Sequence, residues 1–225
     1  MEHKGKLELT WVGKYDDKVL EPRILVEDRE KSYGDPRSEN MLIHGDNLIA
    51  LQALQQDFAG KIKCIYIDPP YNTGSAFEYY DDNLEHSIWL SLMRQRLLLL
   101  RDLLSDDGFL CCQIDDSESH YVKVLLDEIF GRTNYLTTLY VRVRYPDKTL
   151  KSDMDFHKEI EQVLVYRNLF RKSRNIPVRL FLYRRFWYRQ PLRSNSIALK
   201  SRGIFQILKL QWLKSRDLML LTSSF

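Results

Sequence analysis

The sequence predicts an α/β fold with a doubly wound sheet that is incomplete in this chain. Apolar runs typical of buried strands alternate with stretches of helical periodicity between Met41 and Gly131. An alternation of this kind implies right-handed crossovers between strands. A polar loop with two prolines follows the strand-like run Ile62 to Ile67. Because open α/β sheets bind ligands at the carboxyl ends of their strands, we expect the functional site at this loop.

The first predicted strand and helix lie on either side of Gly45. The segment from Met41 to His44 is a short apolar strand, and Gly45 ends it. Asp46 or Asn47 is well placed to cap the helix that follows, since both residue types favour the N-cap position. The helix stops at Gly60 and carries apolar residues at helical spacing, namely Leu48, Leu51, Leu54 and Phe58.

The next strand, helix and strand continue the alternation. Lys61 to Ile67 has the β-branched and aromatic content of a buried strand. His86 to Leu104 is a long helical stretch, and Asp106-Asp107-Gly108 turns the chain into a second buried strand, Phe109 to Ile114. We place the apolar side of the long helix at Ile88, Leu92, Leu99 and Leu103.

One more helix and two more strands are predicted after Ile114. Asp115 with Glu118 resembles a capping box for a helix that ends at Phe130-Gly131. Leu136 to Val143 has the composition of a strand, and Phe156 to Tyr166 contains the last predicted strand.

The residues after Ile67 are suited to binding a planar amine. They read Asp68-Pro69-Pro70-Tyr71 and continue as Asn72-Thr73-Gly74. Proline has a fixed φ and no N–H, so the two prolines form a rigid turn whose carbonyls are free to accept hydrogen bonds. The Asp68 carboxylate and the Pro69 carbonyl can hold both amine hydrogens while Tyr71 offers a flat face to the ring. An ordinary turn after a strand is the alternative, because Asp and Pro are common turn residues.

This motif and its flanks resemble the amino-group DNA methyltransferases, specifically the adenine-N6 modification subunits of type III restriction–modification systems. The resemblance covers about Asn40 to Tyr166. It implies a Rossmann-like methyltransferase sheet, S-adenosylmethionine as the cofactor, and a flipped adenine of double-stranded DNA as the substrate. A second modification subunit and a restriction subunit are the partners that it implies.

The resemblance also implies roles for individual residues. Asp68, Pro69, Pro70 and Tyr71 take the catalytic positions, and Asp46, Asn47 and Asp68 lie near the cofactor. Asn72, Thr73 and His157 are expected near the target base, with Glu159 close by. Two alternatives stay open, since Asp46 can be a helix cap and a lone histidine such as His157 often has a structural role.

One part of the family pattern is missing. The family carries a donor-binding loop of the form Phe-x-Gly-x-Gly after the catalytic motif, but no two of the nine glycines here are separated by a single residue. We therefore expect a truncated copy that does not turn over alone. The competing functions are methylation of an RNA base or a protein amide, and a non-catalytic DNA-binding remnant.

Charge divides the chain into regions. Residues 1–161 contain 20 Lys and Arg against 30 Asp and Glu, whereas residues 162–225 contain 14 against one. We predict an N-terminal arm over 1–39, a partial methyltransferase catalytic domain over 40–167 and an irregular basic tail over 168–225. The tail's composition favours translation in a shifted reading frame over an evolved segment that binds phosphates, and both interpretations stay open.

Composition excludes several other classes. No apolar run approaches the length of a membrane span and Met1 to Thr10 is charged, so we expect a cytoplasmic protein without membrane contact. The five histidines have no ligand spacing, and the side chains of adjacent Cys111 and Cys112 point to opposite faces of a strand. A zinc site is therefore not predicted.

Overall fold

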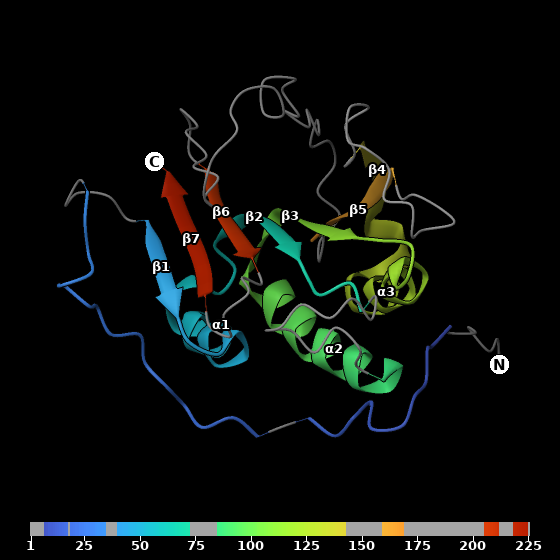
Figure 1. The fold of residues 1–225 in the computed structure, drawn as a ribbon, viewed down its shortest axis with the longest axis horizontal. Coiled ribbons are helices and arrows are strands. Elements are labelled where there is room, and N and C mark those ends of the chain that lie inside the picture. The colour runs from blue at the N-terminus through green and yellow to red at the C-terminus, as the bar shows by residue number, and fades with distance from the viewer. Residues whose placement is uncertain are drawn as a thin grey trace, which may run out of the picture.

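The described part of the chain forms a mixed seven-stranded sheet with α-helices on one face. The structure is a computed structural model that describes residues 7–17, 19–34, 40–72, 85–142 and 159–168, and the backbone of 205–211 and 218–224. Within this part, helices α1 (Asn47–Phe58), α2 (His86–Leu103) and α3 (Ser119–Leu126) lie next to one another along the sheet (Figure 1). Helix α3 runs on into a π-helical turn, Asp127–Gly131, and a short 3-10 turn, Arg132–Asn134.

The strand that carries the Asp-Pro-Pro-Tyr motif lies in the middle of the sheet. The strand order is β1-β7-β6-β2-β3-β5-β4. Strand β2 pairs in parallel with β3 on one side and with β6 on the other, while β5 is antiparallel to both β3 and β4. The bounds are β1 Met41–His44, β2 Ile62–Asp68, β3 Leu104–Ile114, β4 Tyr135–Arg142, β5 Ile160–Arg167, β6 Phe205–Gln211 and β7 Leu218–Ser224.

The predicted α/β class is confirmed, and crossover handedness explains where the helices lie. The chain moves in one direction across the sheet from β1 to β2 to β3, and right-handed connections then place α1 and α2 on the same face. A doubly wound sheet has helices on both faces. The described residues supply helices to one face. None of these helices is long and apolar enough to cross a membrane.

Helix α2 forms the centre of the core, but its buried side differs from the prediction. Of the four predicted residues, Leu103 is buried, Leu92 and Leu99 are half-buried against the core, and Ile88 is 55% exposed. The rest of the buried side is formed by Trp89, Leu90, Met93, Leu97 and Leu100. Leucines occupy nearly every side of this helix, so leucine spacing alone does not define the face that packs on the sheet. The buried side includes Trp89, the largest side chain of the helix, whose indole N–H lies 3.0 Å from the carbonyl oxygen of Pro70, two residues after β2.

Strand β3 begins earlier than predicted. The strand extends from Leu104 to Ile114, so the residues predicted as a turn, Asp106–Gly108, lie within it, between the partner of Ile62 (Leu104) and the partner of Cys64 (Phe109). The register between β2 and β3 shifts between Ile62 and Cys64. At this irregularity a Cβ on Gly108 would lie 2.7 Å from the Ile62 carbonyl oxygen, so the two backbones approach too closely for any other residue.

The N-terminal arm is partly built into the fold. Trp11 donates its indole N–H to Ser91 of α2 at 2.8 Å. Lys14 is only 4% exposed and contacts Glu128 at 2.9 Å, on the π-helical turn after α3. Residues 7–17 therefore fasten the arm to the helical layer.

The structure differs from the predicted irregular tail at two segments. The backbone of 205–211 and 218–224 forms β6 and β7, while residues 169–204 and 212–217 lie outside the described part. Strand β6 covers the edge of β2 that would otherwise expose unpaired N–H and C=O groups. Local pattern misses this pairing because it joins residues about 140 positions apart.

Ending the chain at Asn168 tests the pairing of β6 with β2. We expect amides of the β2 peptide, Ile62–Asp68, to exchange with deuterium about tenfold faster or more in the shortened chain, because one edge loses its partner. Mass spectrometry gives the exchange rate, and the β5 peptide serves as a control that touches neither β6 nor β7. An unchanged β2 rate would show that β6 does not pair there.

Candidate functional site

The site is built at the carboxyl end of β2. Asp68 is the last residue of this strand and is half-buried, Pro69 is buried, and Pro70 and Tyr71 are half-buried. Parallel neighbours on both sides fix the strand's position, so Asp68 leaves the sheet at the edge where α/β proteins bind ligands. The sequence-based placement of this loop at the end of a central strand is confirmed.

A side chain of helix α2 holds the proline turn in place. The fully buried indole of Trp89 donates its N–H to the Pro70 carbonyl at 3.0 Å. The fold thus uses one of the two proline carbonyls. The other, on Pro69, stays the predicted second acceptor for an amine.

Tyr71 is bound through its hydroxyl. The hydroxyl oxygen lies 2.9 Å from Oδ1 of Asp68 and 2.9 Å from Oε2 of Glu161. Burial, and then the two nearby carboxylates, raise the pKa of Tyr71 well above its ordinary value, so the phenol stays protonated. The ring packs against the hydrophobic core, and its predicted stacking on a base stays a prediction.

Three further side chains belong to this network, and the sequence analysis missed them. Near the end of β3, the side-chain amide of Gln113 donates to Oε2 of Glu161 at 2.5 Å. The Tyr66 hydroxyl of β2 donates to Oε1 of the same Gln113 side chain. Glu161 comes from the start of β5, which is antiparallel to β3, so the start of one strand meets the end of the other. The sequence did hold a signal for two of them: Gln113 and Glu161 are polar residues at the ends of strands β3 and β5 that lie beside the site, and these strands are otherwise largely apolar.

A second buried carboxylate fixes the residue after the motif. Asn72 has a φ of 55° and donates its side-chain amide to Oε1 of Glu118 at 2.7 Å. The same oxygen lies 3.1 Å from Nδ1 of His86, at the start of α2. Glu118 is fully buried, and burial raises its pKa above the usual range. One carboxylate therefore joins Asn72 to the beginning of α2.

The predicted capping box of Asp115 and Glu118 is wrong. Asp115 Oδ1 accepts the Ser117 backbone N–H at 2.9 Å, which closes a local turn before α3. Glu118 makes no cap hydrogen bond to the helix, because its side chain points inward to Asn72 and His86. A long-range interaction thus replaces the local one that the spacing suggested.

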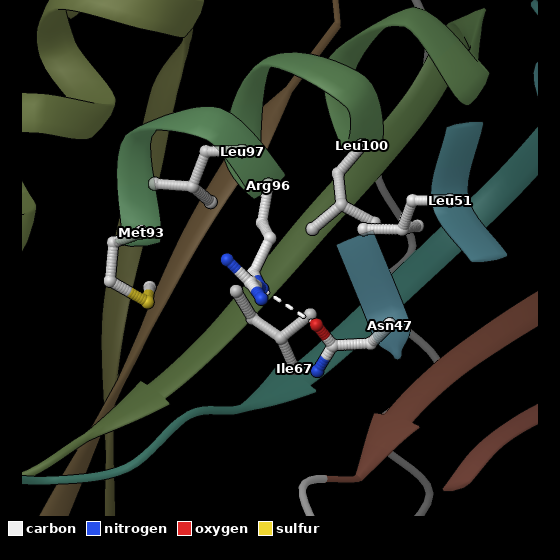
Figure 2. A pocket seen from close by; sticks show the side chains of 7 residues that line it. All are labelled: Asn47, Leu51, Ile67, Met93, Arg96, Leu97 and Leu100. Carbon is white, nitrogen blue, oxygen red and sulfur yellow. Dashed lines mark hydrogen bonds between the residues drawn. The ribbon is translucent and has the colours of Figure 1, made fainter. Parts of the chain in front are cut away.

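Asp46 and Asn47 lie at the start of α1, and both have structural partners. Asp46 Oδ1 accepts the backbone N–H groups of Leu48 and Ile49, at 2.8 and 3.3 Å, which confirms it as the helix cap. Asn47 accepts the Arg96 Nε–H at 2.6 Å (Figure 2). The contact of either residue with a cofactor stays a prediction.

A small cavity connects the start of α1 with the end of β2. Asn47 and Ile67 both line it, and Arg96 points into it from α2 (Figure 2). Its volume is about 10 Å³, which is near the lower limit for one water molecule. The cavity places Asn47 beside the strand that ends in Asp68, so the structure brings the predicted cofactor residues to one edge of the sheet. The other lining residues are Leu51, Met93, Leu97 and Leu100.

The structure does not reach all the predicted site residues. Thr73 and His157 lie outside the described residues. Glu159 is exposed, and one of its carboxylate oxygens lies 3.8 Å from Nη2 of Arg142. Asp68 and Tyr71 are in direct contact, and Asn72 is joined to the same edge through Glu118.

Fold and site together define an α/β protein with an Asp-Pro-Pro-Tyr turn at the ligand-binding edge of its sheet. A family profile described as DNA methylase matches residues 62–198, which is more than half of the chain. The chain belongs to this DNA methylase family. The match runs past Asn168, beyond the point where the resemblance found in the sequence ends.

Modification subunits of type III systems are among the relatives, which confirms the resemblance. The probable type III restriction-modification enzyme HindVI Mod subunit of Haemophilus influenzae is 42% identical over 154 residues, covering 68% of this chain and 20% of that protein. The EcoP15I Mod subunit of Escherichia coli is 31% identical over 199 residues, covering 72% and 30%. The chain therefore spans less than a third of the length of these curated relatives.

A solved structure titled as the M1.HpyAVI–SAM complex matches with 15% identity and a TM-score of 0.37. The match covers 59% of this chain and 59% of that one.

Two substitutions separate the cap role of Asp46 from any other role. Asp46→Ala should lower the free energy of unfolding by about 1 kcal/mol, since two backbone N–H groups lose their acceptor. Asp46→Asn should leave it nearly unchanged, because asparagine caps helices as well as aspartate. Urea denaturation measures both. Equal loss in the two variants would mean that charge, and not the cap, stabilises this end of α1.

Proposed function

We propose that this chain is part of a site-specific DNA methyltransferase that transfers a methyl group from S-adenosylmethionine to N6 of adenine. The position of Asp68-Pro69-Pro70-Tyr71 at the end of the central parallel strand supports this most directly. Family membership and the type III Mod relatives support the same reaction and substrate class. Methylation of RNA or of a protein amide is the alternative that the test below separates.

The proposed role of the turn follows from the chemistry of the amine. The lone pair on adenine N6 is delocalised into the ring, so the nitrogen is a weak nucleophile. Two acceptors that hold its hydrogens favour a more pyramidal nitrogen as the new bond forms. Asp68 and the Pro69 carbonyl supply these acceptors from a turn that Trp89 and the sheet hold rigid.

The residues at the start of α1 suit an adenosine-containing cofactor. S-adenosylmethionine, when bound, supplies an electrophilic methyl group on a sulfonium. The cap hydrogen bonds of Asp46 both use Oδ1, which leaves Oδ2 as an acceptor for hydroxyl groups of a ribose. Asn47 keeps its amide hydrogens as donors while its oxygen holds Arg96. These two residues and Asp68 are the cofactor-binding set that we propose.

The acceptor we propose is an adenine flipped out of double-stranded DNA, because an amine inside a stacked duplex cannot reach Asp68. We expect a second modification subunit and a restriction subunit as partners, because the relatives are subunits of type III restriction-modification enzymes, and we expect a cytoplasmic location. The 225 residues contain no Phe-x-Gly-x-Gly loop, so we infer that turnover needs residues outside them.

A graft tests this function in a complete enzyme. Residues 1–168 replace the matching segment of the HindVI Mod subunit, and the graft is incubated with radiolabelled S-adenosylmethionine and separate DNA, RNA and protein pools. We expect label in DNA as N6-methyladenine. Asp68→Asn should reduce the rate at least about a hundredfold, because a neutral amide replaces the charged acceptor and weakens a preorganised electrostatic interaction with the amine.

Asp106→Asn provides the matched control, because Asp106 is exposed and lies toward the opposite end of β3. Its rate should equal that of the parent graft. Label in RNA or protein instead of DNA would reject the proposed substrate. Undiminished methylation by the Asp68→Asn graft would reject the proposed mechanism.

A further inference from the structure

Two carboxylates compete for one hydrogen at the site. The Tyr71 hydroxyl lies at the same distance, 2.9 Å, from a carboxylate oxygen of Asp68 and from one of Glu161. A phenol carries a single hydrogen, so at any moment it donates to one carboxylate only. The position of that hydrogen decides how much of the Asp68 charge is available to another donor.

A second donor holds the Glu161 carboxylate in place beside the tyrosine. Its Oε2 receives the Gln113 amide at 2.5 Å as well as the tyrosine. Gln113 is oriented by Tyr66, which donates to the Gln113 carbonyl oxygen and so leaves the amide hydrogens facing Glu161. The Gln113 amide and the tyrosine hydroxyl therefore converge on one oxygen of Glu161, and the Gln113 bond fixes this carboxylate beside Tyr71.

The Asp68 carboxylate becomes a stronger acceptor when the Tyr71 hydroxyl hydrogen points toward Glu161. A carboxylate oxygen that already accepts from Tyr71 is a weaker acceptor for an incoming amine, because the same negative charge serves two donors. The tyrosine hydrogen can move from one carboxylate to the other by rotation about the bond between ring and oxygen. The ring itself stays packed against the core, so the change needs no movement of the backbone.

We propose that Glu161 is a positioning residue that competes with Asp68 for the Tyr71 hydrogen and thereby strengthens Asp68 as an acceptor for the substrate amine. This inference rests on the proposed function for its amine substrate, but the hydrogen bonds themselves are independent of it. Glu161 acts through Tyr71 and touches no reacting atom. Strand β5 places it there, because its antiparallel pairing with β3 brings residue 161 to the edge where β2 ends.

The charge effect of Glu161 has to be separated from its hydrogen bond. Glu161→Gln alone lowers the pKa of Asp68 in either case, because a neighbouring negative charge disappears. The informative quantity is the effect of Tyr71→Phe, which removes the hydroxyl. With Glu161 present the hydroxyl is shared, so its removal should raise the pKa of Asp68 only slightly. With glutamine at 161 the hydroxyl belongs to Asp68, so its removal should raise that pKa more.

The experiment is a carbon-13 titration of the Asp68 carboxyl in the full chain, in the parent, both single variants and the double variant. We expect Tyr71→Phe to raise the pKa of Asp68 by at least about half a unit more in the Glu161→Gln background, a threefold difference in the protonation equilibrium. Equal shifts in the two backgrounds would overturn the proposal, because a merely structural Glu161 gives no coupling.

A second background keeps the test decisive if Glu161→Gln does not fold. Gln113→Leu removes a donor from Glu161, which makes Glu161 the stronger acceptor for the tyrosine. Tyr71→Phe should then change the pKa of Asp68 less than in the parent. Asp116→Asn is the control, because Asp116 is bonded to Gln162 and not to this network, and the Tyr71→Phe effect should be unchanged there. A larger effect in Gln113→Leu would contradict the proposal.

The titration uses neither cofactor nor DNA, so its result does not depend on whether the proposed function is correct. Coupling without methylation by the graft would reject the amine substrate and leave the hydrogen-bond exchange in place. Methylation without coupling would reject the role of Glu161 and leave the reaction in place.

Discussion

The hydrogen bond from the Trp89 indole to the Pro70 carbonyl is the contact on which the site depends. It joins the buried centre of α2 to the turn that follows β2, at 3.0 Å. Breaking such a bond leaves a buried donor unpaired, which costs about 1–3 kcal/mol. The sheet fixes where Asp68 leaves the strand, and this bond fixes where the turn goes next. The acceptors of the site are therefore placed by the core.

The edge above this contact is acidic, and the fold supplies it with donors. Asp68, Glu118 and Glu161 come from three separate parts of the chain and meet there. The Tyr71 hydroxyl lies within hydrogen-bond distance of Asp68 and Glu161, and the side-chain amide of Asn72 donates to Glu118. Paired in this way, the carboxylates keep fixed positions without losing their acceptor character. Of the three, Glu118 is fully buried, so the negative charge open to a ligand comes from Asp68 and Glu161, and it favours amines and cationic groups over phosphates.

Local sequence patterns predicted the helices and strands up to Arg167 and the Asp-Pro-Pro-Tyr motif. The features that they did not predict depend on contacts between residues far apart in the sequence. The strand before Asp68, the cap at Asp46 and the strand ending at Arg167 each follow from patterns within about ten residues. The buried side of α2 did not follow, because leucines lie on nearly every side of the helix and their spacing does not mark the face that packs on the sheet. Glu118 and Glu161 were missed because each acts on residues far away in the sequence, 46 and 90 positions. The β6 strand was missed for the same reason.

The most direct measurement of the central claim is a crystal structure of the grafted enzyme bound to its DNA and a non-reactive cofactor analogue. The account predicts an adenine outside the duplex with its N6 within hydrogen-bond reach, about 2.6–3.2 Å, of both the Asp68 carboxylate and the Pro69 carbonyl. The Tyr71 hydroxyl should then lie closer to Glu161 than to Asp68. An adenine that stays stacked in the duplex, or that presents N6 to other residues, would contradict the account.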